Sequence, residues 1–315
     1  MGLLSFIFGN GESKADNTEK KDNREFEILK FDGVKALKAG MVDYAIKCLK
    51  SALEIKQDYD TMEYLATIYL RTYNTDEAKK LLGKMIEMQP DNFVAYTLMA
   101  NVCSQEEDLE QTRHYGLKAL ELNSNQPNLY VLLSRNELRS GNSEQAQEYV
   151  AKSLEQDNSS FVAKQLMAEV LTVNGQYDKA EETINQLITD EVEPDECIIL
   201  LGDLFLAKKN TDEAKAQYER ALEYNPFNEK AKCKLALLYS SMGETQKAID
   251  YLTEEVESSG ESVALFSTLS QLYGALGDEA KKNEFSAKAD ELQDEIEPLK
   301  QGRVKVKEQT IPGIF

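Results

Sequence analysis

The sequence predicts an all-α protein, an α-solenoid of about eight stacked helix–turn–helix repeats, and three observations support that prediction. The 315 residues are rich in helix formers, with only six Pro and no Trp. Small and apolar residues recur with a period of 34 along most of the chain. Within each period, apolar residues stand four apart, and this spacing places them on one face of a helix.

Two series of small residues mark the period. The first lies in the expected second helix of each repeat, at Ala78, Ala146, Ala180, Ala214 and Ala248, with Thr112 at the remaining step. The other lies twelve residues upstream, in the expected first helix, at Gly33, Ala66, Ala100, Ser134, Ala168, Gly202, Ala236 and Ser270. Small side chains at two fixed positions predict that the two helices approach closely there, because a larger side chain would hold the backbones apart.

The repeats are expected to begin near positions 26, 59, 93, 127, 161, 195, 229 and 263. Glycines such as Gly141 and Gly175 stand at the expected turns, where a residue able to take a positive φ ends the first helix. The last helix is predicted to be a polar cap, because a terminal repeat faces water on one side. Its apolar residues Phe285, Ala289 and Leu292 offer a face to the preceding helix, and we expect it to end at about Pro298.

Three regions follow from this pattern. Residues 1–24 comprise an apolar segment and a polar stretch expected to be a flexible tether, residues 25–298 form the repeat array, and residues 299–315 form a basic tail. The apolar run at residues 1–8 is much shorter than the roughly 20 residues that a membrane span needs. In the tail, Arg303, Lys305 and Lys307 alternate with valines, a pattern that suits an extended segment.

The clearest copies read L-G-D-L-F followed by T-D-E-A-K-A-Q-Y-E-R-A-L-E-Y-N-P (201–226), and L-A-L-L-Y followed by G-E-T-Q-K-A-I-D-Y-L (235–252). In these residues the array resembles the tetratricopeptide repeat (TPR) family. The resemblance implies a right-handed superhelix whose first helices line a concave wall. Departures from the family pattern, which put local packing in doubt, are Thr112, Gly116, Glu137, Lys164 and Lys232.

The resemblance places the sixth residue of each first helix on the concave wall. Most of these residues are apolar: Phe31, Tyr64, Leu98, Leu132, Leu166 and Leu200, followed by Lys234 and Thr268. A contiguous apolar stripe on an exposed wall predicts a contact site. The alternative is that neighbouring repeats cover these residues and that they belong to the core.

Polar candidates on the same wall are Asn101, Arg135, Arg139, Glu169 and Asp203. Arg135 and Arg139 stand four residues apart on one helix face, an arrangement suited to binding a carboxylate. The alternative is that they pair with a nearby acidic residue, Glu137, Glu144 or Glu169.

These observations predict a non-catalytic scaffold that binds an extended peptide or helix of a protein partner in its concave groove. With 36 Lys and Arg against 56 Asp and Glu, the net charge of −20 favours a basic or neutral partner and argues against nucleic acid. Nearly all of the chain belongs to repeats and no catalytic or phosphate-binding motif occurs, so no enzyme activity and no cofactor are expected. One His and four scattered Cys suggest no metal site, and free thiols favour a cytoplasmic location.

Two alternatives concern the ends of the chain. Residues 1–8 suggest a peripheral membrane-associated assembly factor, in which the apolar segment inserts into a bilayer surface or a membrane-protein partner. Self-occupancy is the other alternative, with either the apolar N-terminus or the 303–315 tail filling the groove of its own chain or of a second copy.

Overall fold

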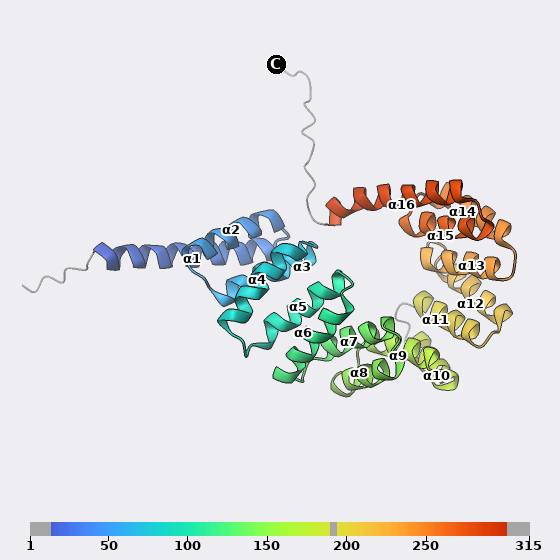
Figure 1. The fold of residues 1–315 in the computed structure, drawn as a ribbon, viewed down its shortest axis with the longest axis horizontal. Helices are drawn as coiled ribbons and strands as arrows, with labels where there is room; N and C mark the ends of the chain where they lie inside the picture. Colours follow the sequence, from blue (N-terminus) through green and yellow to red (C-terminus); the bar gives the residue numbers. More distant parts are fainter. Residues whose placement is uncertain (1–13, 190–193, 301–315) are drawn as a thin grey trace, which may run out of the picture. The chain divides into compact units, whose positions relative to one another are not determined.

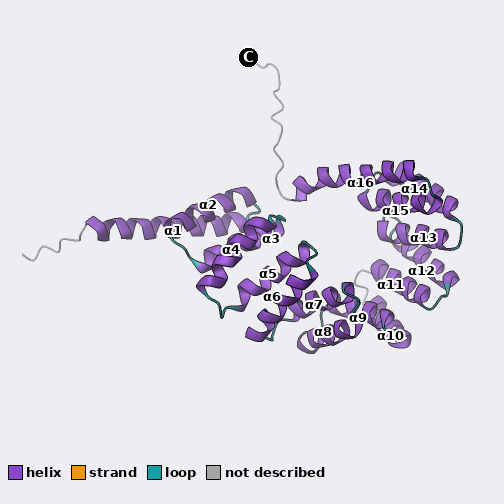
Figure 2. Ribbon diagram, in the orientation of Figure 1, coloured by secondary structure: helices purple, strands orange, loops and turns teal. Residues whose placement is uncertain are grey.

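The computed structural model describes residues 14–189 and 194–300, and within these ranges the chain forms sixteen helices and no strand (Figures 1 and 2). The first helices of the successive repeats are α1 (Lys14–Lys38), α3 (Tyr59–Arg71), α5 (Phe93–Gln105), α7 (Pro127–Arg139), α9 (Phe161–Val173), α11 (Pro194–Ala207), α13 (Glu229–Ser241) and α15 (Val263–Leu276). The second helices are α2 (Val42–Ile55), α4 (Thr75–Met88), α6 (Leu109–Leu122), α8 (Ser143–Gln156), α10 (Tyr177–Thr189), α12 (Thr211–Tyr224), α14 (Thr245–Ser259) and α16 (Glu279–Lys300). The all-α solenoid expected from the 34-residue period is therefore confirmed.

Short polar side chains fix where most first helices begin. A helix leaves its first amide groups without intrahelical partners, and a preceding Asp, Asn or Ser can accept a hydrogen bond from one of them. The residues that cap first helices in this way are Asp58, Asn92, Ser160, Asn228 and Ser262. These caps stand directly before helices that begin at 59, 93, 161, 229 and 263. They are the local reason why these helices begin at the positions that the 34-residue period predicts.

The turn between the two helices of a repeat uses one residue with positive φ. Glycine fills that position in five repeats, at Gly40, Gly141, Gly175, Gly243 and Gly277. Three other repeats carry a side chain there, at Tyr73, Glu107 and Lys209. The turn geometry is thus maintained even where the sequence lacks the glycine that makes it easy to form.

Helices within a repeat approach closely at the two series of small residues, as predicted. The hydroxyl of Ser134 donates a 2.7 Å hydrogen bond to the carbonyl of Ala146, and Ser270 bonds in the same way to the carbonyl of Lys282 at 2.9 Å. At Gly202, an added Cβ would lie 2.5 Å from the ring of Tyr218. Between successive repeats, Gly116 of α6 is constrained in the same way, because an added Cβ would lie 2.7 Å from the side chain of Leu133 in α7.

The chain divides into two compact units, unit 1 (Met1–Asp108) and unit 2 (Leu109–Phe315). In unit 2, the odd-numbered helices form an inner layer and the even-numbered helices an outer layer (Figure 1). The apolar core lies between the layers, where residues of successive repeats join one another. At the end of the array, Phe285, Ala289 and Leu292 of α16 pack against this core, as predicted.

Both terminal helices are longer than expected. Residues 14–24, expected to be part of a flexible tether, belong to α1. Extending a helix from a packed segment gains one hydrogen bond per residue, and the opposite charges of Lys21 and Glu25 stand four residues apart. The capping helix α16 continues past Pro298 to Lys300, so the proline removes one amide donor in the last turn without ending the helix.

The predictions for the two chain ends concern segments outside the described ranges. The apolar segment at residues 1–8, on which the membrane-associated alternative depends, and the tail at residues 303–315, on which self-occupancy depends, both remain sequence-based predictions.

One departure from the family pattern, Lys232, is accommodated by a specific partner. Lys232 is buried in α13, where most repeats carry an apolar residue. Its ammonium group lies 2.5 Å from the carboxylate of Glu255 and donates a hydrogen bond to the hydroxyl of Ser259 at 2.9 Å. A buried charge is tolerated when it is paired and hydrogen-bonded in this way.

Candidate protein-interaction groove

A cavity of about 340 Å³ lies in the inner layer of unit 2, and we call it the Glu169 cavity. It is formed by α7, α9, α10, α11 and α13. The residues that line it are Leu138, Ala168, Glu169, Thr172, Val173, Ile184, Leu200, Asp203, Lys230 and Lys234. All except Ile184 come from first helices, which is the layer that the family resemblance assigns to a binding surface.

A second cavity of about 650 Å³, the Cys233 cavity, adjoins it along α11, α13 and α15. Its lining comprises Glu196, Asn228, Glu229, Lys230, Cys233, Lys234, Leu237, Ala264, Ser267 and Thr268. Lys230 and Lys234 line both cavities, so the two are parts of one surface. We call this surface the inner groove; it extends from α7 to α15.

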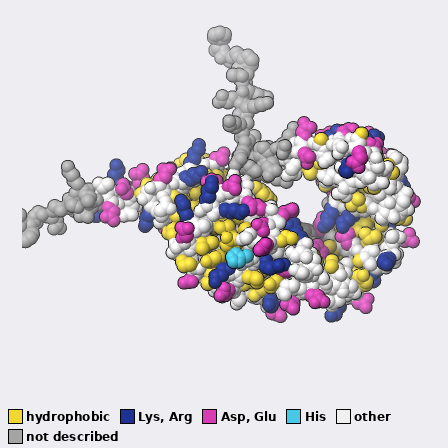
Figure 3. All heavy atoms as spheres, viewed as in Figure 1, with side chains coloured by type: hydrophobic (Ala, Val, Ile, Leu, Met, Phe, Trp, Pro, Cys, Tyr) yellow, Lys and Arg dark blue, Asp and Glu magenta, His cyan; other side chains and the backbone are white. Residues whose placement is uncertain are grey.

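Most charges of the inner groove are already paired. Lys234 lies 2.9 Å from the carboxylate of Asp203, which also accepts a 2.6 Å hydrogen bond from the hydroxyl of Tyr218. Burial, together with the charge of Asp203, raises the pKa of Tyr218 above its ordinary range. Lys230 lies 2.8 Å from the carboxylate of Glu196. Basic and acidic side chains accordingly appear side by side along the inner edge of unit 2 (Figure 3).

Two carboxylates of the inner groove are exceptions: Glu229, which accepts a 2.6 Å hydrogen bond from the hydroxyl of Ser262, and Glu169. The side chain of Glu169 is exposed on the wall of the cavity, and within the described part of the chain it forms no ion pair. The surrounding protein displaces water from the carboxyl group and so raises its pKa. The positive charges of Lys230, Arg135 and Lys234 oppose this rise and the negative charge of Asp203 adds to it, with a net pKa above the ordinary value.

The structure divides the predicted site residues between the two units. Phe31, Tyr64, Leu98 and Asn101 lie in unit 1. Phe31 is 66% exposed and Tyr64 is also exposed, whereas Leu98 is half-buried. Asn101 is half-buried as well, and its side-chain amide donates a 2.8 Å hydrogen bond to the carbonyl of Thr97.

In unit 2, three of the predicted residues, Glu169, Leu200 and Asp203, come together at the Glu169 cavity. Arg135 is exposed and lies close enough to Glu169 to affect its pKa. Arg139 is exposed too, and Leu132 is half-buried, but neither lines the cavity.

The expectation that Leu166 and Leu200 stand on an exposed wall is wrong. Leu166 is 1% exposed and packs into a core cluster with residues of α7 and α8. Leu200 is 6% exposed and packs against α9 and α10, so it forms the floor of the cavity. At both positions the preceding repeat covers the side chain, which was the alternative considered for the apolar stripe.

Four residues of the Glu169 cavity were not predicted from the sequence: Leu138, Thr172, Val173 and Lys230. The signal for Val173 was present, because it stands at the thirteenth position of its repeat, as Arg139 does in the preceding one. Only polar residues were considered at that position. Lys230 stands at the second position of its repeat, where no binding role was expected.

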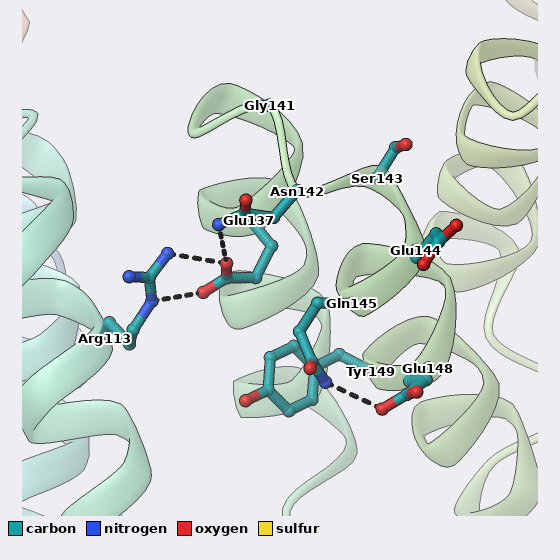
Figure 4. A pocket seen from close by; sticks show the side chains of 9 residues that line it. All are labelled: Arg113, Glu137, Gly141, Asn142, Ser143, Glu144, Gln145, Glu148 and Tyr149. Carbon is teal, nitrogen blue, oxygen red and sulfur yellow. Dashed lines mark hydrogen bonds and ion pairs between the residues drawn. The ribbon is translucent and has the colours of Figure 1, made fainter.

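A third cavity, of about 670 Å³, surrounds an ion pair that the sequence did not predict (Figure 4). Glu137 of α7, one of the partners considered for Arg135 and Arg139, pairs with Arg113 of α6. Asn142 donates a further hydrogen bond to the Glu137 carboxylate at 2.9 Å. The carboxylate is thus saturated by residues of its own chain, so this cavity is less suited to ligand binding than the inner groove.

Two family models, both described as tetratricopeptide repeat, match residues 137–196 and 199–262. The chain is a tetratricopeptide repeat protein. Solved structures with the same fold include a tetratricopeptide repeat protein from Parabacteroides merdae, with a TM-score of 0.57 and 17% identity over 89% of this chain and 98% of that one. PilW, a type IV pilus biogenesis factor, aligns with a TM-score of 0.55 and 14% identity over 68% of this chain and 99% of its own.

Two proteins that are named as members of larger complexes are also similar in sequence to this chain. Anaphase-promoting complex subunit 3 of Schizosaccharomyces pombe is 21% identical over 245 residues, which cover 76% of this chain and 37% of the relative. BBSome complex member BBS4 of Bos taurus is 35% identical over 77 residues, covering 24% of this chain and 15% of the relative. This TPR chain therefore spans only a minor part of the length of either relative.

Tetratricopeptide repeats support a protein-interaction scaffold in general terms, and proteins built in this way are typically non-catalytic. In the described ranges, no helix is sufficiently long and apolar to cross a membrane. Nor do those residues bring three His, Cys, Asp or Glu side chains together as metal ligands. The four cysteines are free thiols, and only Cys233 is not fully buried.

Proposed function

We propose that the inner groove of unit 2 binds an extended segment or helix of a protein partner. The observation that carries this proposal is the continuity of two cavities across successive first helices through their shared residues Lys230 and Lys234. Such a surface suits a ligand that is long and narrow, because it crosses several repeats. In this proposal the protein acts by binding alone, in the cytoplasm, without catalysis and without nucleic acid.

Apolar side chains on the groove would supply much of the binding free energy. Val173 is 62% exposed beside the Glu169 cavity, and Leu237 is exposed in the Cys233 cavity. Burying such a side chain under a ligand contributes about 1.5–3 kcal/mol when the contact is complete. The net charge of −20 favours a partner segment that is basic or neutral and accelerates its encounter at low salt.

Site-specific photo-crosslinking in the native host tests the proposal. A photoreactive phenylalanine analogue is placed at Val173 or at Leu237, and for comparison at Tyr224 of α12, which belongs to the outer layer. Tyr224 is a matched control because it is 62% exposed, as Val173 is. We expect the same partner to be crosslinked from the two groove positions and not from Tyr224.

Capture of that partner from Tyr224 with equal yield, or its absence at both groove positions, would contradict the proposal. Circular dichroism of each labelled protein verifies that the helices are intact, so that a missing crosslink is not the result of unfolding.

A further inference from the structure

Building on the proposed function of the inner groove, we propose that Glu169 is the receptor for an arginine side chain of the bound segment. An aliphatic neighbour of that arginine packs on Leu138 and Val173. The ligand is thus a partner segment in which an arginine is flanked by aliphatic residues.

The first argument is the distribution of charge around the cavity. Lys234 is paired with Asp203 and Lys230 with Glu196, at 2.9 and 2.8 Å. These pairs satisfy the two lysines and Asp203, whereas Glu169 forms no ion pair in the described part of the chain and is acted on by the charge of Arg135. A ligand cation therefore finds one carboxylate that it can bind without displacing an existing partner.

The second argument is that this carboxylate, although it reaches solvent on the cavity wall, is partly desolvated by the surrounding helices. Water displaced by the surrounding helices raises the pKa of Glu169, so its ionised form is less stable than that of a carboxylate in water. Hydrogen bonds between ions of opposite charge are stronger than those between neutral groups, and they strengthen further as water is excluded. A cation bound at Glu169 would recover the free energy that the carboxylate loses to desolvation.

The apolar lining of the cavity favours arginine over lysine. Leu138, Thr172 and Val173 line the cavity together with Glu169, and Leu200 forms the floor. A guanidinium group is planar, weakly hydrated and able to bind a carboxylate through two parallel hydrogen bonds, whereas a lysine ammonium is a strongly hydrated point charge. Arginine thus suits a carboxylate beside apolar side chains.

The size of the cavity limits what enters it. Its volume of about 340 Å³ is at the lower end of the range of ligand sites, roughly 300–1,000 Å³. It therefore admits one or two side chains of a segment that continues along the groove. The segment 303–307 of this chain, with its alternating basic and valine residues, has related chemistry and is a competing occupant that the experiment must distinguish.

Fluorescence anisotropy with two synthetic peptides tests the proposal. One peptide carries the triplet Leu-Arg-Val between Gly-Ser flanks, and the other carries citrulline, a neutral isostere, in place of arginine. Each is titrated with the full-length protein and with two variants, Glu169→Gln and the control Glu182→Gln. Glu182 is an exposed carboxylate of the outer helix α10, so its removal changes the net charge by the same amount.

We expect the wild-type protein to bind the arginine peptide about tenfold more tightly than the citrulline peptide, a difference of about 1.4 kcal/mol. Glu169→Gln should remove that preference by weakening only the arginine peptide, and Glu182→Gln should preserve it. The comparison of the two peptides on the wild-type protein needs no variant and stays decisive if Glu169→Gln fails to fold.

Equal affinity for both peptides, or an undiminished preference in Glu169→Gln, would overturn the role of Glu169. A further variant, Val173→Glu, separates this failure from failure of the groove itself: if it abolishes binding of both peptides, the groove stands and only the arginine site is lost. Binding that appears only in full-length protein carrying Arg303→Ala, Lys305→Ala and Lys307→Ala would assign the cavity to the tail and overturn the assignment to a partner.

Discussion

Arg113 of α6 donates two hydrogen bonds, of 2.5 and 2.6 Å, to the carboxylate of Glu137 in α7 (Figure 4). Glu137 is 1% exposed and stands where the family pattern places an aromatic residue. Burial by itself would raise the pKa of Glu137, but the hydrogen bonds from Arg113 and Asn142 and the charge of Arg113 outweigh it, and the pKa is lowered. An ion pair thus joins the second helix of the third repeat to the first helix of the fourth.

Arg113→Ala should destabilise the protein, because it leaves the Glu137 carboxylate buried without its counter-charge. Removing one partner of a buried pair costs about 3–5 kcal/mol, and we expect a value near the lower limit since Arg113 is partly exposed. Urea unfolding followed by circular dichroism measures the change. Lys118→Ala, which breaks an exposed pair with Glu121 on the same helix, is the control and should cost less than about 0.5 kcal/mol. Equal losses in the two variants would refute the structural role of the buried pair.

The same pair should make stability depend on pH in the acid range. Since the pKa of Glu137 is lower in the folded state than in the unfolded chain, the folded state binds this proton less readily. The stabilisation is complete above the unfolded value, about 4.3, and is lost as the pH falls through the lower folded value. The free energy of unfolding of the wild type should therefore exceed that of Glu137→Gln by a constant amount from neutral pH to about pH 5, and the difference should shrink below pH 4. A difference that persists unchanged at pH 3 would rule out this linkage.

Two glycine substitutions should have opposite effects. In Gly202→Ala the new Cβ would lie 2.5 Å from the ring of Tyr218, which is fully buried and donates a hydrogen bond to Asp203. We therefore expect the free energy of unfolding to fall by about 1–3 kcal/mol. Gly83→Ala in α4 meets no atom within 4 Å and should stabilise the protein by about 0.5–1 kcal/mol, because alanine favours the helix. Thermal unfolding of both variants checks the signs. A neutral Gly202→Ala would mean that the two helices of this repeat separate readily.

The repeat architecture could be predicted because one local pattern is used eight times. Small residues such as Ser134 and Ala146 fix the register of the two helices in a repeat. Because the period is constant, the helix positions of one repeat predict those of the others. The extra length of α1 could not be predicted in the same way. Residues 14–24 carry no apolar stripe, and their helix depends on continuation from the packed part of α1.

The site was predicted less completely, because periodicity assigns a face to each residue but not the depth to which a neighbour covers it. Leu132 and Leu166 occupy the same position in successive repeats, yet the first is half-buried and the second is core. The repeat pattern also does not predict which side chains of successive repeats form ion pairs. The partner of Glu137 is Arg113 of the preceding repeat. Asp203 is bound by Lys234 and Tyr218, whereas Glu169, at the same position of its repeat, forms no ion pair in the described part of the chain.

Ile184 and Leu200 belong both to a core cluster and to the lining of the Glu169 cavity. Only one layer of side chains therefore separates the hydrophobic interior from the ligand surface. A segment seated there would shield the backbone of α9 and α11 from transient opening, so that recognition and local folding become linked equilibria. In a scaffold of this kind, binding of a ligand in the groove would slow hydrogen exchange of the backbone amides in the repeats that contact the ligand.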